Sequence, residues 1–303
     1  MSLVRAVLSL MVVASAAACG GGNAPASESG GPAPAPAGGV VIRLTGSDTM
    51  VNLDQAWAEN YKRVKPDVSV QIAGGGSGVG IAGLIDGILD IAASSRKMEP
   101  AEIDRATKSA GSPPQEFAVG LDALAVYVDD SNPLKEIALD ELAEIYGDEG
   151  KLTKWSQLGI KNAACSSDEI LRIGRQNNSG TYAYFREAVL GRTREFKLGS
   201  VDQSGSKDVV ELVTRTPCAI GYSGMAYGAP GARAVAVAKK KGETAYPPKL
   251  ETALDGTYPI SRPLYFYSHG TPTPPVKEFI DWTLSDEGQK ILQDIGYVPA
   301  PKK

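Results

Sequence analysis

The sequence predicts an α/β fold with a mostly parallel sheet, because strand-like runs alternate with amphipathic helical segments along the chain. Three of these units share a further feature: the strand ends in a loop of Gly, Ser, Thr and Asn that opens a helix. The strands are residues 40–44, 68–73 and 171–175, and the loops are residues 45–49, 74–78 and 177–181. A helix N-terminus presents unpaired N–H groups and the positive end of the helix dipole, so each junction is a potential anion site.

Helical periodicity supports a helix after each of the three loops. In the first helix Leu53, Trp57 and Tyr61 recur at helical spacing before Pro66, and in the third Gly191 is the expected stop. Further strands are expected at residues 91–93, 123–128, 219–222, 233–238 and 264–267, and further helices at 100–110, 139–146, 206–214 and 275–293. We interpret the strand at 123–128 and the region 259–264 as crossings between two lobes.

The N-terminal residues predict export. Arg5 is followed by a short apolar run at residues 6–18, which is too short for a stable membrane span and is typical of a secretory signal. The residues up to Cys19 resemble a bacterial lipoprotein processing site, which predicts that Cys19 becomes the lipidated N-terminus; ordinary cleavage near Ala18 is the alternative. The Gly/Pro/Ala/Ser-rich segment at 19–39 predicts a flexible tether, because it lacks the bulky side chains that a core needs.

Length, charge and cysteine count narrow the class of protein. About 285 residues remain after the signal, enough for two lobes of ordinary domain size. The net charge of −4 and the lack of a basic block argue against nucleic acid as a partner. An anionic ligand is still compatible with that charge, because a buried site works through local dipoles. Besides Cys19 the chain has Cys165 and Cys218, which are expected to pair in an exported protein; two buried free thiols are the alternative.

Motifs for other functions are weak. The GxGxxG run at 78–83 formally fits a dinucleotide fingerprint, but export removes the usual cofactor pool and the glycines begin at the helix start instead of in the strand-exit turn. Two Ser-x-x-Lys sequences, at 94–97 and 204–207, lack the companion elements of penicillin-recognising enzymes. His269 is the only histidine, which disfavours both a serine triad and a metal cage. We expect no enzyme, no cofactor and no metal.

The loop hydroxyls and two nearby arginines each have an ordinary structural interpretation. Taken alone, each hydroxyl would be a helix cap and each arginine a surface ion pair. The residues concerned are Ser47, Thr49, Ser77, Ser179, Thr181, Arg96 and Arg175. Because such residues recur at all three junctions, we favour a shared cradle for a small oxyanion over independent caps.

Four segments resemble the ligand loops of periplasmic phosphate-binding proteins, the substrate-binding components of the phosphate-specific ABC importer. They are TGSDTM at 45–50, GGGSGVGI at 74–81, ASSR at 93–96 and RQNNSGT at 175–181. Later segments at 217–222, 284–289 and 296–299 are similar to the same family, so the resemblance covers nearly everything after the tether. It implies a two-lobed, Venus-flytrap fold of the type II periplasmic-binding-protein class, with crossover strands as the hinge and phosphate in the cleft.

The resemblance also implies roles for individual residues. The phosphate-binding residues are expected to be Ser47, Thr49, Met50 through its amide, Ser77, Arg96, Arg175, Ser179, Gly180 and Thr181. One position departs from the family, since Ser95 stands where better-known members place an aspartate that accepts the proton of the bound phosphate. Asp48 is the nearest substitute by sequence, unless it is a plain helix cap. Asp48 and Ser95 are thus the candidates for a proton acceptor or second contact.

We therefore predict a monomeric, lipid-anchored receptor that captures inorganic phosphate and delivers it to the membrane permease of an ABC importer, in the periplasm or at the outer face of the membrane. The predicted organisation is a signal peptide at 1–18, a tether at 19–39, one lobe at 40–122 plus 265–303, and a second lobe at 123–264. A receptor for another oxyanion, such as sulfate, molybdate or tungstate, is one alternative. An exported phosphate-ester hydrolase on the same fold is the alternative from another class.

Overall fold

A sheet of ten strands runs through the residues that the structure, a computed structural model, describes: 39–191 and 193–300. The strand order is β2-β1-β3-β10-β4-β8-β6-β7, and β9 pairs with β4 and β5. The predicted signal, the predicted lipidation site at Cys19 and the tether up to residue 38 lie outside the described residues. Across the described ranges, no helix combines the length and the apolar character needed to cross a membrane.

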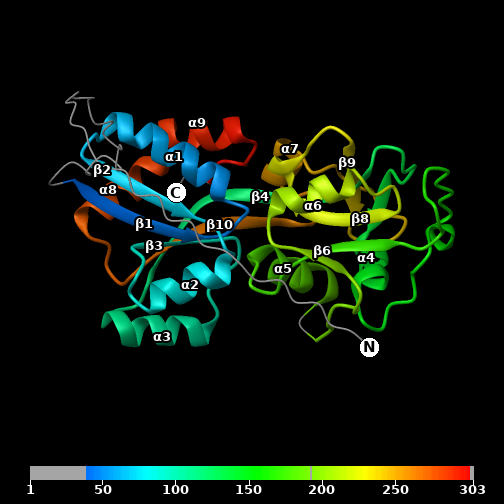
Figure 1. Cartoon of the computed structure of the whole chain (residues 1–303), viewed down its shortest axis with the longest axis horizontal. Helices are drawn as coiled ribbons and strands as arrows, with labels where there is room; N and C mark the ends of the chain where they lie inside the picture. The colour runs from blue at the N-terminus through cyan, green and yellow to red at the C-terminus, as the bar shows by residue number, and fades with distance from the viewer. Residues whose placement is uncertain (1–38, 192, 301–303) are drawn as a thin grey trace, which may run out of the picture. The chain divides into compact units, whose positions relative to one another are not determined.

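The first half of the sheet contains three parallel strands: β1 (Val40–Gly46) pairs with β2 (Val68–Ala73) and with β3 (Ile91–Ser94). Five helices belong to this half: α1 (Val51–Val64), α2 (Ser77–Ile85), α3 (Pro100–Ala110), α8 (Pro274–Thr283) and α9 (Asp286–Ile295). Figure 1 shows α1 and α9 on one face of the strands and α2 with α3 on the other. An aromatic core holds α1 and α8 to the sheet, where Trp57 meets Phe266 and Tyr61 meets Phe279 edge-on.

The second half repeats this plan. Strand β6 (Leu171–Arg175) pairs in parallel with β7 (Val201–Gln203) and β8 (Ala219–Gly224), and β5 (Glu136–Ala138) pairs in parallel with β9 (Ala232–Ala238). The helices are α4 (Leu139–Tyr146), α5 (Gly180–Phe185), α6 (Ser206–Val213) and α7 (Leu250–Leu254). Phe185 stacks on Tyr222 with ring centroids 3.8 Å apart, which fixes α5 against β8. Cys165 and Cys218 are joined by a disulfide, with their Cα atoms 4.9 Å apart.

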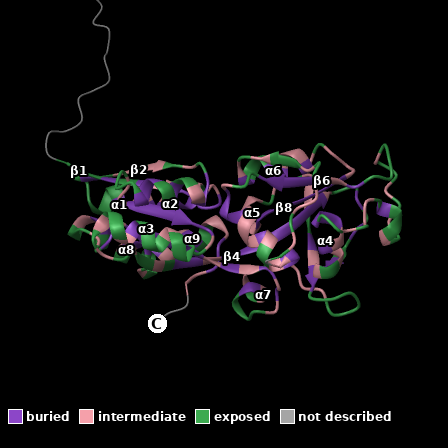
Figure 2. Ribbon diagram, turned by 90° about the horizontal axis from the view of Figure 1, so that it is seen from below, coloured by how far each residue is buried: buried purple, intermediate pink, exposed green. Residues whose placement is uncertain are grey.

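One long strand belongs to both halves. The first part of β4 (Gln115–Asp129) pairs antiparallel with β10 (Ser261–Ser268), and its second part, from Leu124, pairs with β8 and β9. The change of partner falls between Ala123 and Leu124, close to the predicted crossing. Figure 2 shows β4 and β8 largely buried. Within the β4–β10 ladder Arg262 lies opposite Asp122, so two charged residues face each other where the halves join.

The predicted helices and strands mostly have the right type in the structure, but their bounds differ more often. The helix predicted over 100–110 is α3, and the strand predicted over 123–128 is only the second part of the much longer β4. The prediction of a single helix over 275–293 is wrong, because two helices, α8 and α9, meet in this range. Ser285 separates them, since its side chain accepts a hydrogen bond from the Gly288 amide and caps α9.

Candidate functional site

The three predicted loops converge where the two halves meet. The parallel strands β1, β2 and β3 end at one edge of the sheet, and the loop after β6 approaches that edge from the second half. Thr49 Oγ1 lies 2.9 Å from Thr181 Oγ1, and the Gly78 amide donates to the Asn178 carbonyl at 3.0 Å. The structure therefore brings together side chains that are 132 residues apart in the sequence.

A group of buried hydroxyls and two guanidinium groups forms what we call the polar cluster. Its members are Ser47, Thr49, Ser77, Ser95, Arg175, Thr181, Ser206 and Arg262, all of them at most 2% exposed. Ser47 Oγ donates to Ser95 Oγ at 2.9 Å, and the Ser95 amide donates to Ser77 Oγ at 3.1 Å. These bonds give the three buried serine hydroxyls hydrogen-bond partners, which is the condition for burying them.

Gly180 allows the two halves to approach at this point. A Cβ atom on Gly180 would lie 2.5 Å from Ser95 Oγ and closer still to Ser77 Oγ, so a side chain here would collide with the serines. Ser179, one residue earlier, is the N-cap of α5, and its hydroxyl accepts from the Thr181 amide at 3.1 Å. The structure thus gives Ser179 the ordinary capping role and places Gly180 and Thr181 against the cluster.

Arg175 is buried between the halves, and its guanidinium has four hydrogen-bond partners, one of which is the Gln203 carbonyl, 3.3 Å from Nε. Nη1 donates to Ser206 Oγ at 2.8 Å, and Nη2 donates to the Ser204 carbonyl at 2.7 Å and to Asp48 Oδ2 at 3.0 Å. Burial lowers the pKa of Arg175 from its ordinary value, and the Asp48 carboxylate partly opposes this. A guanidinium stays protonated in proteins, so Arg175 contributes a buried positive charge to the cluster.

Arg262 is a second guanidinium that the sequence did not predict for the site. Its Nη2 donates to Thr181 Oγ1 at 2.9 Å, to Thr49 Oγ1 at 3.3 Å and to Asp122 Oδ2 at 2.9 Å. Burial raises the pKa of Asp122, while the Arg262 charge opposes that shift. An arginine and an aspartate inside otherwise apolar strands are the signal that could have identified this pair, because such residues are rarely buried without a role.

Ser206 was also missed, although the sequence carried a clue. Ser204 and Gly205 connect β7 to Ser206, the first residue of α6, so this is a fourth use of the strand-to-loop-to-helix junction. The Ser206 hydroxyl accepts a hydrogen bond from Arg175 Nη1 and lies 3.4 Å from Thr49 Oγ1. The short strand β7 was not predicted, and without it the junction was not recognised.

The structure does not bring Arg96 into the cluster. Its guanidinium forms a two-bond ion pair with Glu102 in the first turn of α3, with N–O distances of 2.7 and 2.8 Å. The Met50 amide also has a partner within the protein, because it donates a hydrogen bond to the Ser47 carbonyl at 2.9 Å. The contacts of these two residues therefore correspond to the ordinary interpretations, an ion pair and a turn, and do not support their expected place in the anion site.

Asp48 and Ser95, the candidates for a proton acceptor, have different surroundings. Ser95 is enclosed by Ser47 and Ser77. Asp48 accepts from the Gly75 amide through Oδ1 and from Arg175 through Oδ2, and α1 has no side-chain cap, so the helix-capping interpretation of Asp48 is wrong. The Tyr227 hydroxyl donates to the carbonyls of Asp48 and Thr49, which fixes the loop that carries both residues.

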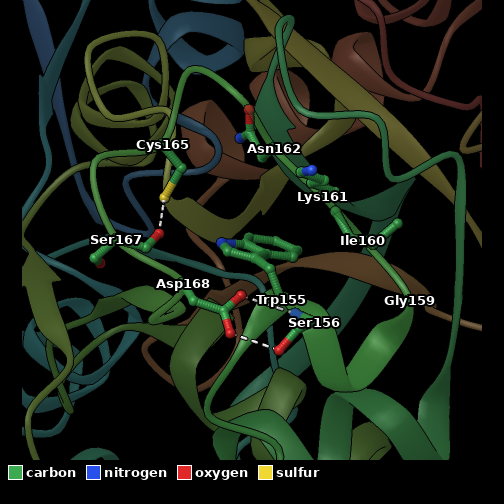
Figure 3. Close-up of a pocket in the computed structure, with 9 residues that line it drawn as sticks. All are labelled: Trp155, Ser156, Gly159, Ile160, Lys161, Asn162, Cys165, Ser167 and Asp168. Atoms are coloured by element: carbon green, nitrogen blue, oxygen red, sulfur yellow. Dashed lines mark hydrogen bonds between the residues drawn. The ribbon is translucent and has the colours of Figure 1, made fainter.

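A surface hollow beside the disulfide is separate from the polar cluster. Its volume is about 420 Å³, and it is lined by residues of the segment 155–168, among them Trp155, Asp168 and Cys165. Figure 3 shows the Asp168 carboxylate turned toward Ser156, whose hydroxyl and amide both donate to it. The Asp168 carboxylate in this hollow is thus already paired with Ser156, so we place the candidate site at the polar cluster.

The cluster has the chemistry of an oxyanion site. Hydroxyls can rotate to donate to an anion, guanidinium groups give charge-assisted hydrogen bonds, and the site is closed to solvent. His269, the chain's only histidine, lies elsewhere, with Nδ1 2.7 Å from the Leu84 carbonyl. The cluster therefore offers donors and positive charge without the histidine base that a serine triad would need.

Several known proteins are similar to this chain in sequence and in fold. The PBP superfamily domain matches residues 23–287. The chain is similar to the phosphate-binding protein PstS of Pseudomonas aeruginosa, at 34% identity over 272 residues that cover 86% of this chain and 84% of that protein. It is also similar to the PstS of Bacillus subtilis, at 29% identity over 261 residues that cover 85% and 80%. A crystal structure of a candidate phosphate ABC transporter substrate-binding protein with bound phosphate, from Clostridium perfringens, matches with a TM-score of 0.76 at 28% identity and covers 86% of this chain and 100% of that one.

Proposed function

We propose that this chain captures inorganic phosphate outside the cytoplasm and delivers it to the permease of an ABC importer. The chain belongs to the PstS family of phosphate-binding proteins within the PBP superfamily. The relatives from Pseudomonas and Bacillus carry the phosphate-binding name, and the Clostridium structure contains phosphate. Proteins of this family are transport receptors and not enzymes. The observation that carries the proposal is the polar cluster, where buried hydroxyls and guanidinium groups from both halves converge.

Phosphate would be held by donors from both halves. Ser47, Thr49 and Ser77 contribute hydroxyls from the first half, and Arg175 and Thr181 face them from the second. On binding, these groups exchange their bonds to one another for bonds to phosphate oxygens. Arg175 contributes most, because a hydrogen bond from a charged donor is about twice as strong as a neutral one.

Calorimetric titration with a panel of oxyanions tests this function. We expect phosphate to bind at one per chain and more tightly than sulfate, molybdate or tungstate. Lys65→Gln is a suitable control variant, because Lys65 forms an exposed ion pair with Glu278 outside the cluster. Binding of molybdate or sulfate in preference to phosphate would identify a receptor for another oxyanion.

The predicted lobes, 40–122 with 265–303 and 123–264, are proposed as the two bodies that close on the ligand. The support is that β4 changes partners at residues 123 and 124, so few strands connect the two halves. A ligand that contacts both sets of donors favours the closed arrangement, because those contacts exist only there.

Attachment to the membrane through lipidated Cys19 is proposed from the small residues before it and the tether after it. More than one acyl chain is needed for stable anchoring, and the processed lipoproteins that this site resembles carry several. We expect cell fractionation to find the wild-type protein in the membrane fraction and Cys19→Ala either soluble or unprocessed. Membrane retention of a cleaved Cys19→Ala protein would contradict lipidation. We also propose that the protein is a monomer. Light scattering on Cys19→Ala protein from the soluble fraction measures its oligomeric state.

A further inference from the structure

Arg262 and Asp122 form an ion pair on the long strands that join the two halves. They lie opposite each other in the β4–β10 ladder, and Nε and Nη2 of Arg262 both donate to Asp122 Oδ2, at 3.2 and 2.9 Å. The two side chains are 1% and 0% exposed. A buried ion pair is weak evidence for stability, because desolvation offsets the attraction. Its position beside the polar cluster therefore calls for an explanation other than folding.

Arg262 also contacts other members of the polar cluster. Nη2 donates to Thr49 Oγ1 and Thr181 Oγ1, one from each half, and Nη1 donates to the Ser95 carbonyl at 3.2 Å. A hydroxyl that accepts from a guanidinium must direct its own hydrogen elsewhere. Arg262 thus makes the two threonines donors toward a bound anion, and it adds a positive charge of its own.

Asp122 is placed to balance that charge at close range. Thr49 and Asp122 approach the same side of Gly224: a Cβ atom there would lie 3.1 Å from Asp122 Oδ1 and 3.3 Å from Thr49 Cγ2. Of the two carboxylates that pair with cluster guanidiniums, Asp48 is 19% exposed, whereas Asp122 is fully buried. A buried charge is screened far less than an exposed one, so solvent screens the charge of Asp122 less than that of Asp48.

We propose that Arg262 is the second anion-binding guanidinium of the site and that Asp122 is its positioning residue, which also makes the site favour a protonated oxyanion over a fully ionised one. This inference rests on the proposed phosphate-binding function. Phosphate near neutral pH keeps a proton, whereas sulfate does not. Part of the phosphate is moreover the monoanion at that pH, whereas sulfate is a dianion, so the buried negative charge of Asp122 disfavours sulfate relative to phosphate.

Competition calorimetry with phosphate and sulfate on three variants tests the pair. For Asp122→Asn, we expect the phosphate-to-sulfate affinity ratio to fall at least about tenfold, because Arg262 then faces the anion uncompensated. For Arg262→Gln, we expect both anions to lose about tenfold to a hundredfold in affinity, since charge-assisted bonds are lost. For Arg262→Lys, which keeps the charge, we expect partial recovery, because an ammonium cannot reproduce the planar fork.

The matched control is Arg172→Gln, which removes a largely buried arginine that donates to the Leu198 carbonyl in the second half. We expect this variant to keep the wild-type ratio. An unchanged ratio in Asp122→Asn, or unchanged affinity in Arg262→Gln if Asp122→Asn does not fold, overturns the inference while leaving phosphate binding intact. If the wild-type protein binds no phosphate, the proposed function itself fails.

Discussion

The two ion pairs of the polar cluster differ in what holds them together. Arg262 and Asp122 are register partners on neighbouring strands, so their contact depends only on strand pairing. Arg175 and Asp48 come from different halves, 127 residues apart in the sequence, and meet only while the halves are in contact. The first pair therefore belongs to the scaffold of paired strands, whereas we expect the second to depend on the proposed closure. Binding strength and conformational change can be separated by perturbing one pair at a time.

Removing the guanidinium of the closure-dependent pair is expected to have the largest effect. Arg175→Ala deletes charge-assisted bonds of about 1.5–3 kcal/mol each, so phosphate affinity should fall about tenfold to a hundredfold or more. Arg175→Lys should restore only part of it, because the ammonium lacks the planar geometry. Calorimetry measures both variants. Wild-type affinity in Arg175→Ala would show that the anion binds elsewhere.

Removing the carboxylate of the same pair is expected to have a smaller effect. Both oxygens of Asp48 already accept hydrogen bonds, from Gly75 and Arg175, and the side chain is partly exposed. Asp48→Asn should therefore weaken phosphate and sulfate alike by up to about fivefold, the range of a partly solvated ion pair. Competition calorimetry gives both affinities. A selective gain in sulfate binding would assign selectivity to Asp48 instead of Asp122.

Closure is expected to appear as a modest change in size. Small-angle scattering of the wild-type protein should show a smaller radius of gyration with saturating phosphate than without it, because the Arg175–Asp48 contact requires the halves to meet. Asp48→Asn, which lacks that ion pair, should show less compaction at equal saturation. An unchanged radius in the saturated wild-type protein would mean that binding does not close the halves.

The smallest effect on phosphate affinity is expected from substitution of Arg96. The sequence predicts this residue in the site, whereas in the structure its guanidinium pairs with Glu102 outside the cluster. Its ion pair with Glu102 lies at the start of α3 with side chains 15% and 20% exposed. Arg96→Ala should change stability by less than about 1 kcal/mol and leave phosphate affinity within about twofold of wild type. Thermal unfolding and calorimetry test this together. A tenfold loss of affinity in a folded Arg96→Ala protein would restore Arg96 to the site.

Local chemistry explains which parts of the site could be predicted. The junctions after β1, β2 and β6 were recognised because glycine, hydroxyl residues and helical periodicity occur within a few consecutive residues. The ends of β1 and β2 meet because parallel strands end at one edge, whereas β6 runs in the opposite direction in the second half and its end faces theirs. Arg96 lies outside the cluster because sequence proximity to Ser95 does not fix side-chain direction, and its ion pair with Glu102 does.

The missed residues depend on contacts that no local pattern specifies. Arg262 and Asp122 are 140 residues apart and meet only through the register of β4 and β10. Ser206 enters the site because β7 is present, a strand of three residues that is too short for a periodic signal. The unexpected break between α8 and α9 has a local cause, the Ser285 cap, which competed with an otherwise continuous helical pattern.

The lack of a side chain at Gly180 sets a size limit for anyone who would redesign this receptor. The Cα of Gly180 faces Ser77 and Ser95 so closely that the backbone of α5, and not a side chain, forms that wall of the site. Glycine cannot be trimmed further, so space for a larger anion cannot be gained there by substitution. Enlarging the site on that side would require moving α5 away from the serines, which its stacking of Phe185 on Tyr222 opposes.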